Sequence, residues 1–581
     1  MKTLMLGNEA LARGLYEAGC SFISSYPGTP STEISEFAAK YDEIYAEWAP
    51  NEKVALEAAM GAAFGGVRAF CAMKHVGLNV AADPLFVAAP VGVGGGLVIA
   101  VADDPGMHSS QNEQDSRHYA RAAKIPMLEP ADSAECLEMV KLAYMISETY
   151  DTPVIIRLTT RVAHARSLVS ISERVLPEKR KYEKDAAKHV MMPANARRRH
   201  VEVESRLEKL IEYGCTSKIN CIEENGNELG ILCSGNVYNY VKEVFGENAS
   251  ILKLGMVFPF PVQLAKKFAN SVKRLIVVEE LEEFFEQYIR AAGIQCDGKN
   301  ILPLCGEFSQ DLLREKLLDE TPKYVKYDES LPIRPPVLCP GCPHRGVYYT
   351  LKKLKLNVFG DIGCYTLGAV APLNAIDTTL CMGASISGIH GFEKASPDKA
   401  DNSVAVIGDS TFMHSGITGL VNLTYNKGRA TVMILDNSIT AMTGHQHNPC
   451  TGYTLKGEAV HGLLPEKVCE GVGVNPEHIR IVDPNNIIRL EEILKEELAY
   501  DGVSVIITRR PCVLLKNVKK DSLCTINNDL CKNCRACMKI GCPAISITES
   551  GKPMVDATLC TGCNLCKELC KFNAISTITK A

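Results

Sequence analysis

The chain has 581 residues, of which 46% are hydrophobic and 23% charged, and its formal net charge is −5. This length and composition predict a globular protein of about three to five domains. The slight acidity, without a basic stripe carrying interleaved aromatic residues, excludes a nucleic-acid scaffold. The first residues lack the pattern of a secretory signal, so we expect a cytoplasmic protein whose 24 cysteines bind metal or are simply buried.

Apolar, strand-like runs alternate with helical patterns along most of the chain, and polar or glycine-rich turns end most of them. This alternation predicts an α/β fold of doubly wound parallel sheets, with ligands at the carboxyl ends of the strands. One run, "FVAAPVGVGGGLVIAVA" at 86–102, is short for a membrane span and contains four glycines. We interpret it as a glycine-rich turn before a buried strand. The runs lie at 21–30, 96–106, 153–160, 228–236, 274–280, 403–410, 430–437 and 503–510.

Two stretches indicate joins between domains. The charged, proline-containing stretch 177–200 includes the basic run "NARRRH" and is interpreted as a solvated linker. The second join is the proline-rich "RPPVLCPGCP" at 334–343. We therefore place boundaries near 190, 325 and 520, which gives segments 1–190, 191–325, 326–520 and 521–581.

A strand–helix–strand unit follows in "VIGDSTFMHSGITGLVNLTYNKGRATVMILDN". One strand ends at Gly408-Asp409 and the next at Asp436-Asn437, so a carboxylate and an amide meet at one sheet edge. Oxygen ligands of this kind suit Mg²⁺ bound to a diphosphate, with Asp409, Asn437 and the Ile439 carbonyl as three ligands. The alternative is a plain turn with an acidic cap.

The last 51 residues hold two cysteine sets, each C-x2-C-x2-C followed by a distant fourth cysteine. This is the bacterial two-cluster ferredoxin pattern, in which the fourth cysteine ligates the other cluster. CxxC pairs also bind zinc, but two close triads suit cubanes better. The segments "AISIT" and "AISTI" match as an internal repeat should. One 4Fe–4S cluster would take Cys531, Cys534, Cys537 and Cys570, and the other Cys542, Cys560, Cys563 and Cys566.

The "GDS…N" unit resembles the fingerprint of thiamine diphosphate (ThDP) enzymes, with Ser410 where a glycine is usual. ThDP enzymes also need a glutamate from a second domain, which faces the aminopyrimidine ring and promotes deprotonation of the cofactor. "NEKVALEAAMGAAFGG" at 51–66 resembles that glutamate helix and assigns the role to Glu52. Glu57, inside the helix, is the competing candidate, with a solvated face as its alternative role.

Taken together, the chain resembles the 2-oxoacid:ferredoxin oxidoreductases, and the match extends to the large subunits of their indolepyruvate branch. "YPGTPSTE" (26–33) resembles the substrate loop, in which Thr29 would contact the 2-oxoacid carboxylate. "CPGCPHRG" (339–346), "DIGCYTLG" (361–368) and "SSQNEQDSRHYA" (109–120) also match. His75, Arg117 and His118 are candidate substrate contacts, with structural roles as the alternative. The residues expected at the cofactor are Glu52, Cys364, Gly408, Asp409, Ser410, Asn437 and Ile439.

The resemblance implies a catalytic large subunit that oxidises an arylpyruvate with coenzyme A and external ferredoxin. No segment remains for a further domain of the reaction, so a smaller subunit is expected, in a heterotetramer of two of each. In related members Cys339, Cys342, Cys364 and a fourth cysteine, here Cys512, hold a third cluster. The alternative is buried thiols that pack on the cofactor. Two other functions stay open, a non-redox ThDP decarboxylase and a bare electron-transfer subunit.

Overall fold

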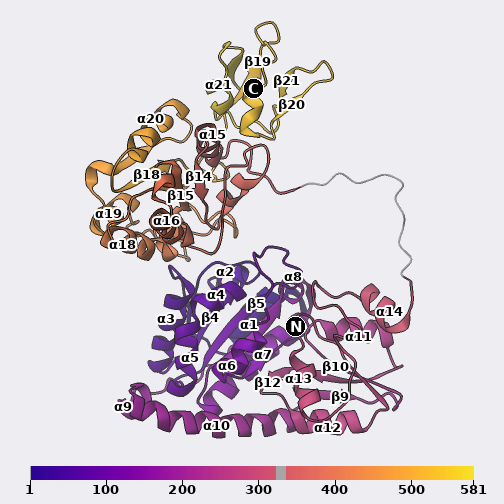
Figure 1. Cartoon of the computed structure of the whole chain (residues 1–581). Coiled ribbons are helices and arrows are strands. Elements are labelled where there is room, and N and C mark those ends of the chain that lie inside the picture. Colours follow the sequence, from indigo (N-terminus) through magenta and orange to yellow (C-terminus); the bar gives the residue numbers. More distant parts are fainter. Residues whose placement is uncertain (1, 322–334, 581) are drawn as a thin grey trace. The chain divides into compact units, whose positions relative to one another are not determined.

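The computed structural model describes residues 2–321 and 335–580. The chain forms two compact units, 1–328 and 329–581 (Figure 1). The boundary predicted at 325 lies outside the described residues. None of the described helices is long and apolar enough to cross a membrane.

The first unit is built on a seven-stranded sheet of order β12-β6-β7-β5-β4-β2-β3. All neighbouring strands are parallel except β12, which runs antiparallel to β6. In the run at 86–102, residues 86–91 form the end of a helix, which was not predicted. The glycine-rich turn at 92–96 and the buried strand β5 that follows are as predicted. The strands are β2 (Phe22–Ser25), β3 (Tyr45–Trp48), β4 (Ala69–Lys74), β5 (Leu97–Asp103), β6 (Met127–Leu128), β7 (Val154–Thr159) and β12 (Met256–Phe258).

Helices cover both faces of this sheet, so that β4, β5 and β7 are buried at every residue. α3 (Glu52–Phe64) and α5 (Ala82–Val91) pack against one face, and α1 (Gly7–Glu17) and α7 (Ser133–Tyr150) pack together on the other. Shorter helices follow individual strands at the carboxyl edge. The remaining elements are α2 (Thr32–Ala38), α4 (His75–Val80), α6 (Arg117–Ala123), α8 (Thr160–His164) and an antiparallel pair, β1 (Lys2–Leu6) with β8 (Arg166–Ser170).

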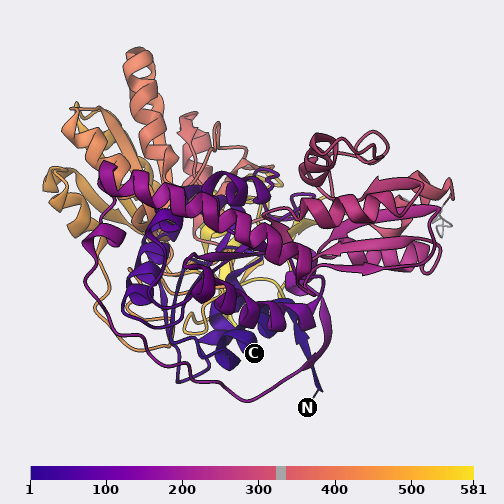
Figure 2. The ribbon, with the colours of Figure 1, turned by 90° about the horizontal axis from the view of Figure 1, so that it is seen from below.

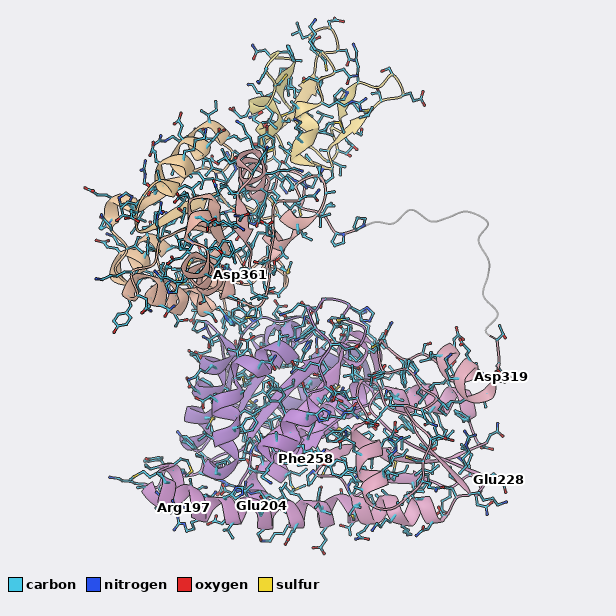
Figure 3. The ribbon with its side chains drawn as sticks, in the orientation of Figure 1. Arg197, Glu204, Glu228, Phe258, Asp319 and Asp361 are labelled. Carbon is cyan, nitrogen blue, oxygen red and sulfur yellow. The ribbon has the colours of Figure 1, made fainter. Side chains whose placement is uncertain are left out.

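A four-stranded sheet of order β13-β10-β11-β9 completes the first unit. Its core is continuous with that of the larger sheet, since Leu232, Leu252 and Phe284 belong to the cluster that also contains Leu56. Phe258 of β12 is buried in this unit (Figure 3). The elements are β9 (Cys221–Glu223), β10 (Leu229–Ser234), β11 (Ser250–Leu254), β13 (Arg274–Val277), α11 (Val237–Phe245), α12 (Val262–Asn270), α13 (Phe284–Ala291) and α14 (Gln310–Leu318).

The linker predicted around the basic run is wrong in its second half. Helix α10 (Pro193–Thr216) is 24 residues long and begins within the stretch, after the single turn of α9 (Ala186–His189). Proline at its first position fits a helix start, because the missing N–H has no partner there. Arg199 is buried and donates to the carbonyl of Pro90 at 2.6 Å. Figures 1 and 2 show α10 running along both sheets of the first unit. The domain boundary near 190 stays a prediction.

The second unit contains a five-stranded parallel sheet of order β14-β15-β16-β18-β17. Alternate residues of β15 enter separate cores, Val404 and Val406 on one face and Ala405 and Ile407 on the other. The sheet is therefore doubly wound, as predicted. Its strands are β14 (Asn357–Phe359), β15 (Ser403–Gly408), β16 (Ala430–Asp436), β17 (Ile479–Val482) and β18 (Val503–Arg509); its α-helices are α15 (His344–Leu354), α16 (Ala384–Ala395), α17 (Asp409–Thr411), α18 (Ile417–Tyr425), α19 (Pro465–Gly471) and α20 (Ile487–Leu498).

The C-terminal part of this unit is a small α+β fold with internal symmetry. Two antiparallel pairs, β19 (Ser522–Ile526) with β22 (Ile575–Thr579) and β20 (Ile545–Ile547) with β21 (Pro553–Val555), are joined by short helical turns. The repeated "AISIT" and "AISTI" segments supply β20 and β22. The turns are η5 (Ala536–Ile540) and α21 (Leu565–Glu568).

Candidate active site and electron-transfer centres

Glu52 is the first residue of α3 and lies at the carboxyl edge of the seven-stranded sheet. The side chain of Asn51 caps the helix by accepting a hydrogen bond from the N–H of Val54 at 2.9 Å. Glu52 is only 4% exposed. Its carboxylate lies so close to Gly77 that a Cβ there would stand 2.5 Å from Oε1. The α4 backbone therefore holds this carboxylate in place.

Glu57 differs from Glu52 in both burial and partners. It is exposed and forms an ion pair with Lys53 on the surface of the same helix. A solvated carboxylate paired with a lysine has the character of a surface residue. The geometry therefore favours Glu52 as the functional carboxylate of α3.

The loop that contains Thr29 follows β2 at the same sheet edge. Thr29 is half-buried. The loop is fixed from both ends, because Asn8 Nδ2 donates to the Pro30 carbonyl at 2.7 Å and Ser31 Oγ donates to the Gly28 carbonyl at 2.8 Å. The strands β2, β3 and β4 are neighbours, so Thr29 and Glu52 share one edge of the sheet.

Arg117 and His118 join the two sheets of the first unit instead of facing a substrate site. Arg117 is 1% exposed and forms ion pairs of 2.6 Å with both Asp115 and Glu279. Burial opposes ionisation of Asp115, yet the guanidinium lowers the pKa of its carboxyl to about 2. His118 pairs with Glu282 at 2.8 Å. The structural interpretation of these two residues is the one that the contacts support.

His75 also has a built structural partner. It is fully buried, and its Nε2 lies 3.0 Å from Asn112 Oδ1. The backbone carbonyl of His75 accepts a hydrogen bond from Gln114 Nε2 at 3.1 Å. These contacts attach the "SSQNEQDSRHYA" segment to the start of α4.

In the second unit, Asp409 and Asn437 lie side by side at the carboxyl ends of β15 and β16. The parallel register that pairs Gly408 with Leu435 places them there. One atom of the Asn437 amide lies 3.2 Å from Asp409 Oδ1 and 2.7 Å from the Ile439 carbonyl oxygen. With nitrogen in that position the amide donates two hydrogen bonds. With oxygen there, three oxygens converge as a divalent cation requires.

The electrostatics of this edge also fit a bound cation. Asp409 is 2% exposed, and burial, followed by the charge of Asp436, raises the pKa of its carboxyl to about 7. Its Oδ2 accepts a hydrogen bond from Asn448 Nδ2 at 3.3 Å. A divalent cation would compensate this buried charge. Asp409, Asn437 and Ile439 thus fit Mg²⁺.

Two neighbours shape the same edge. Gly408 lies against Tyr365, because a Cβ on it would stand 2.6 Å from the ring. Ser410 Oγ accepts a hydrogen bond from Thr440 Oγ1 at 2.9 Å. Asp361, labelled in Figure 3, accepts from the N–H groups of Gly383 (2.9 Å) and Ser385 (3.0 Å). These contacts fix the "DIGCYTLG" segment beside the GDS turn.

The described residues contain no group of three or more His, Cys, Asp or Glu arranged to hold a single metal ion. The tail cysteines surround a cavity instead. The cavity is lined by four thiols together with Ile526 and Phe572; the four are Cys531, Cys534, Cys537 and Cys570. The structure therefore brings the fourth cysteine of the second set to the triad of the first.

The other four tail cysteines also lie together. Burial raises the pKa of the Cys563 thiol, and the neighbouring thiols of Cys542 and Cys560 raise it further. Cys542 and Cys566 belong to the same small core. The crossed pattern of the two sets is thus present in the fold, although the ligand assignment stays a prediction.

Two residues near the tail were missed by the sequence analysis. Cys524 of β19 donates its backbone N–H to Cys560 Sγ at 3.3 Å. Arg345 is buried and donates to the carbonyls of Cys339, Ile540 and Gly541 at 3.0, 2.9 and 2.6 Å. The only signal for Arg345 was its place in "CPGCPHRG". Its contacts join that motif to the turn before Cys542.

The remaining cysteine set lies beside the diphosphate edge. Burial raises the pKa of the Cys364 thiol to about 11, and the thiols of Cys512 and Cys339 add to the effect. Burial raises the pKa of the Cys342 thiol to about 12, and the neighbouring thiols of Cys339 and Cys364 raise it further. The N–H of Cys512 donates to the Asn437 carbonyl at 2.9 Å. The four thiols gather there, and both interpretations of them stay open.

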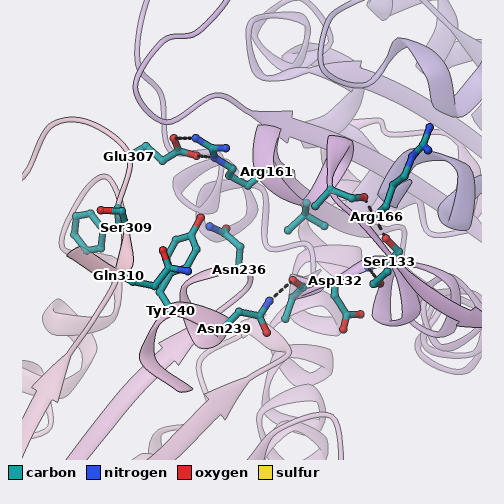
Figure 4. Close-up of a pocket in the computed structure, with 15 residues that line it drawn as sticks. Asp132, Ser133, Arg161, Arg166, Asn236, Asn239, Tyr240, Glu307, Ser309 and Gln310 are labelled. Carbon is teal, nitrogen blue, oxygen red and sulfur yellow. Dashed lines mark hydrogen bonds and ion pairs between the residues drawn. The ribbon is translucent and has the colours of Figure 1, made fainter. Parts of the chain in front are cut away.

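A separate cavity of about 650 Å³ lies in the first unit (Figure 4). Its lining residues come from four segments, 131–133, 161–167, 236–240 and 307–310. Arg161 and Glu307 form an ion pair at its rim. Asn236 accepts a hydrogen bond from Thr159 Oγ1 at 2.9 Å. None of the residues predicted for the active site lines this cavity.

Known proteins match the chain over nearly its whole length. It is 39% identical to the indolepyruvate oxidoreductase subunit IorA of Archaeoglobus fulgidus over 99% of this chain and 97% of that protein. The subunit of the same name from Thermococcus kodakarensis is 40% identical over 99% and 96%. The chain belongs to the IorA family of 2-oxoacid:ferredoxin oxidoreductase subunits.

Family models match the segments that carry the predicted sites. The pyruvate flavodoxin/ferredoxin oxidoreductase thiamine diphosphate-binding model matches residues 13–220, which include Thr29 and Glu52. The C-terminal thiamine pyrophosphate-binding domain matches 361–508, and the 4Fe-4S binding domain matches 553–576. The 2-oxoglutarate synthase subunit KorA of Archaeoglobus fulgidus is 27% identical over 52% of this chain. These findings confirm the predicted fold class and an oxidoreductase that uses thiamine diphosphate and 4Fe–4S chemistry.

Proposed function

We propose that this chain is the catalytic large subunit of an arylpyruvate:ferredoxin oxidoreductase. The reaction converts indolepyruvate, coenzyme A and two oxidised ferredoxins into indoleacetyl-CoA, carbon dioxide, two reduced ferredoxins and one proton. The name shared by the relatives supports this substrate class. The observation that carries the proposal is the convergence of Asp409, Asn437 and Ile439 in a chain that also carries two crossed cysteine sets.

All of the residues proposed to anchor the diphosphate and the clusters belong to the second unit. Asp409, Asn437 and Ile439 would hold Mg²⁺ and the diphosphate of ThDP, with Gly408, Ser410 and Cys364 around them. When bound, ThDP supplies the carbanion that makes cleavage beside the keto group accessible. Two 4Fe–4S clusters in the tail would carry the electrons singly towards ferredoxin. An alternative form of the same proposal adds a third cluster, bound by Cys339, Cys342, Cys364 and Cys512.

Residues of the first unit would bind the substrate and activate the cofactor. Glu52 would hold a proton at its carboxylate, facing the aminopyrimidine ring, and its buried position keeps water from it. Thr29 would contact the carboxylate of the 2-oxoacid. We assign 1–190 as the pyrimidine domain, 191–325 as a domain like the C-terminal one of transketolase, 326–520 as the diphosphate domain and 521–581 as the ferredoxin-like domain. The protein would act in the cytoplasm with a smaller subunit, two of each.

A substrate panel tests the proposal. The anaerobically purified two-subunit enzyme is given indolepyruvate, phenylpyruvate, pyruvate or 2-oxoglutarate, and ferredoxin reduction is followed with and without coenzyme A. We expect coenzyme A-dependent reduction with a kcat/KM for the arylpyruvates that is higher than for the two aliphatic acids. Preference for 2-oxoglutarate would overturn the substrate class. Release of carbon dioxide without ferredoxin reduction would instead show a non-redox decarboxylase.

A further inference from the structure

Lys74 is a buried lysine at the same sheet edge as Thr29 and Glu52. It is the last residue of β4 and is 7% exposed. Its side chain packs against the Thr29 loop, because a Cβ on Gly28 would stand 3.0 Å from Lys74 Cβ. Gly77, which touches the Glu52 carboxylate, follows three residues later. Lys74 therefore lies between the loop assigned to the substrate and the carboxylate assigned to the cofactor.

The ammonium group of Lys74 has more donors than the structure gives it acceptors. Nζ donates to the Ser109 carbonyl at 2.7 Å, the one hydrogen bond found for it among the described residues. An ammonium carries three N–H donors. Burial lowers the pKa of Lys74 to about 8, and the charge of Asp104 opposes that shift. A buried cation with so few partners is costly unless a ligand supplies an anion.

Asp104 does not supply that anion by direct contact. Its carboxylate already accepts hydrogen bonds from the Ser109 N–H (2.9 Å), Ser110 Oγ (2.6 Å) and Thr160 Oγ1 (2.7 Å). It acts on Lys74 through space and helps to keep the lysine charged. The edge thus holds a lysine whose donors remain available to a ligand.

The neighbouring buried arginines are fully engaged. Arg117 pairs with Asp115 and Glu279. Arg157 pairs with Asp103 and Glu129, both at 2.7 Å. Among Lys74, Arg117 and Arg157, Lys74 is the one for which the described residues provide no ion pair.

We propose that the ammonium group of Lys74 binds the carboxylate of the 2-oxoacid substrate, beside Thr29. This inference rests on the proposed function, because it requires a substrate with a carboxylate next to its keto group. A carboxylate that leaves water needs a charged hydrogen-bond donor, and Lys74 provides one at this sheet edge. Carbon dioxide is neutral, so the pairing ends when the carbon–carbon bond breaks. Lys74 therefore selects and orients the substrate before the chemical step.

The competing explanation is that Lys74 only anchors the Ser109 carbonyl. The two explanations differ in what they predict for ligands that lack a carboxylate. A substrate-binding lysine affects carboxylate ligands alone, whereas an anchor affects every ligand of the site. Indole-3-propionate and its primary amide are a matched pair of substrate-like inhibitors for this comparison.

The experiment uses the two-subunit enzyme loaded with its cofactors. Inhibition constants for the acid and the amide are measured for wild type, Lys74→Met, Lys74→Arg and a control, Lys299→Met. Lys299 is a half-buried lysine whose pKa is also lowered by burial, and it donates to the carbonyls of Glu279 (2.6 Å) and Pro303 (3.2 Å). Retention of ThDP and iron verifies that each variant is folded.

We expect wild type to bind the acid more tightly than the amide. In Lys74→Met the inhibition constant of the acid should rise by about 100-fold, because a buried ligand group loses its charged partner. The inhibition constant of the amide should change by no more than about threefold. Lys74→Arg should keep the preference for the acid, and Lys299→Met should change neither constant.

The proposal would be overturned if Lys74→Met lost affinity equally for both inhibitors, or if it kept its affinity for the acid. If wild type fails to oxidise arylpyruvates but oxidises another 2-oxoacid, the proposed substrate class fails while the Lys74 proposal stands or falls by its own readout. In that case KM for the accepted acid should rise by about 100-fold in Lys74→Met, with a smaller change in kcat. An unchanged KM would refute the role of Lys74.

Discussion

Asp409 is a buried carboxylate whose charge is unfavourable in the fold but useful for binding a metal ion. Without a cation its pKa lies at about 7, because burial and Asp436 disfavour the charge. Binding of Mg²⁺ requires the deprotonated form. The metal and the proton therefore compete for the same oxygen atoms.

This competition predicts a pH-dependent affinity for Mg²⁺–ThDP. Below about pH 7 the affinity should fall by up to about tenfold per pH unit, because Asp409 is protonated before the metal binds. Titration of the cofactor-free protein from pH 5.5 to 8.5 measures it. Asp409→Asn should bind weakly at every pH and should lose the part of the pH dependence that Asp409 contributes. An identical pH profile in wild type and variant would contradict the assignment.

Glu52 supports a second prediction at the level of single residues. Glu52→Gln should retain ThDP but lose most of the activity, roughly 100-fold or more, because an amide cannot relay a proton. Glu57→Gln is the matched control, since Glu57 is exposed on the same helix. Steady-state turnover and bound ThDP are measured for both. If Glu57→Gln lost turnover while Glu52→Gln kept normal turnover, the role would belong to Glu57.

At the scale of elements, patterns local in sequence were predicted well. Strand ends placed Asp409 beside Asn437, and the helix start placed Glu52, since both follow from local periodicity and capping. Contacts between distant segments were not predictable in this way. Arg117 could not be matched to Glu279, 162 residues away, and the start of α10 was interpreted as linker because its charged residues hide a buried face.

The ferredoxin-like tail is an element whose role can be tested separately. Cys534→Ala should lose about half of the tail iron and stop ferredoxin reduction, while carbon dioxide release continues in part. Cys524→Ala is the control, because Cys524 lies beside Cys560 but belongs to neither predicted ligand set. Iron content and both activities are measured. Full iron with normal ferredoxin reduction in Cys534→Ala would contradict the ligand assignment.

At the scale of the whole molecule, we proposed that this chain acts together with a smaller subunit. We therefore predict that the isolated chain binds ThDP and iron but shows at most a few per cent of the coenzyme A-dependent activity, roughly the loss expected when an active site is incomplete. Addition of the small subunit should restore activity at a defined stoichiometry. Full activity from this polypeptide alone would refute the two-subunit proposal.

The cofactor content of the anaerobically purified chain tests the central claim most directly. Thiamine diphosphate, iron, zinc and acid-labile sulfide are measured in one preparation, per chain. We expect one ThDP and about eight iron atoms with matching sulfide, as two 4Fe–4S clusters require. About twelve iron atoms are expected only if the third cysteine set holds a cluster. ThDP without iron would leave a non-redox decarboxylase, and iron without ThDP would leave an electron-transfer subunit. Zinc in place of iron would contradict the cluster assignment altogether.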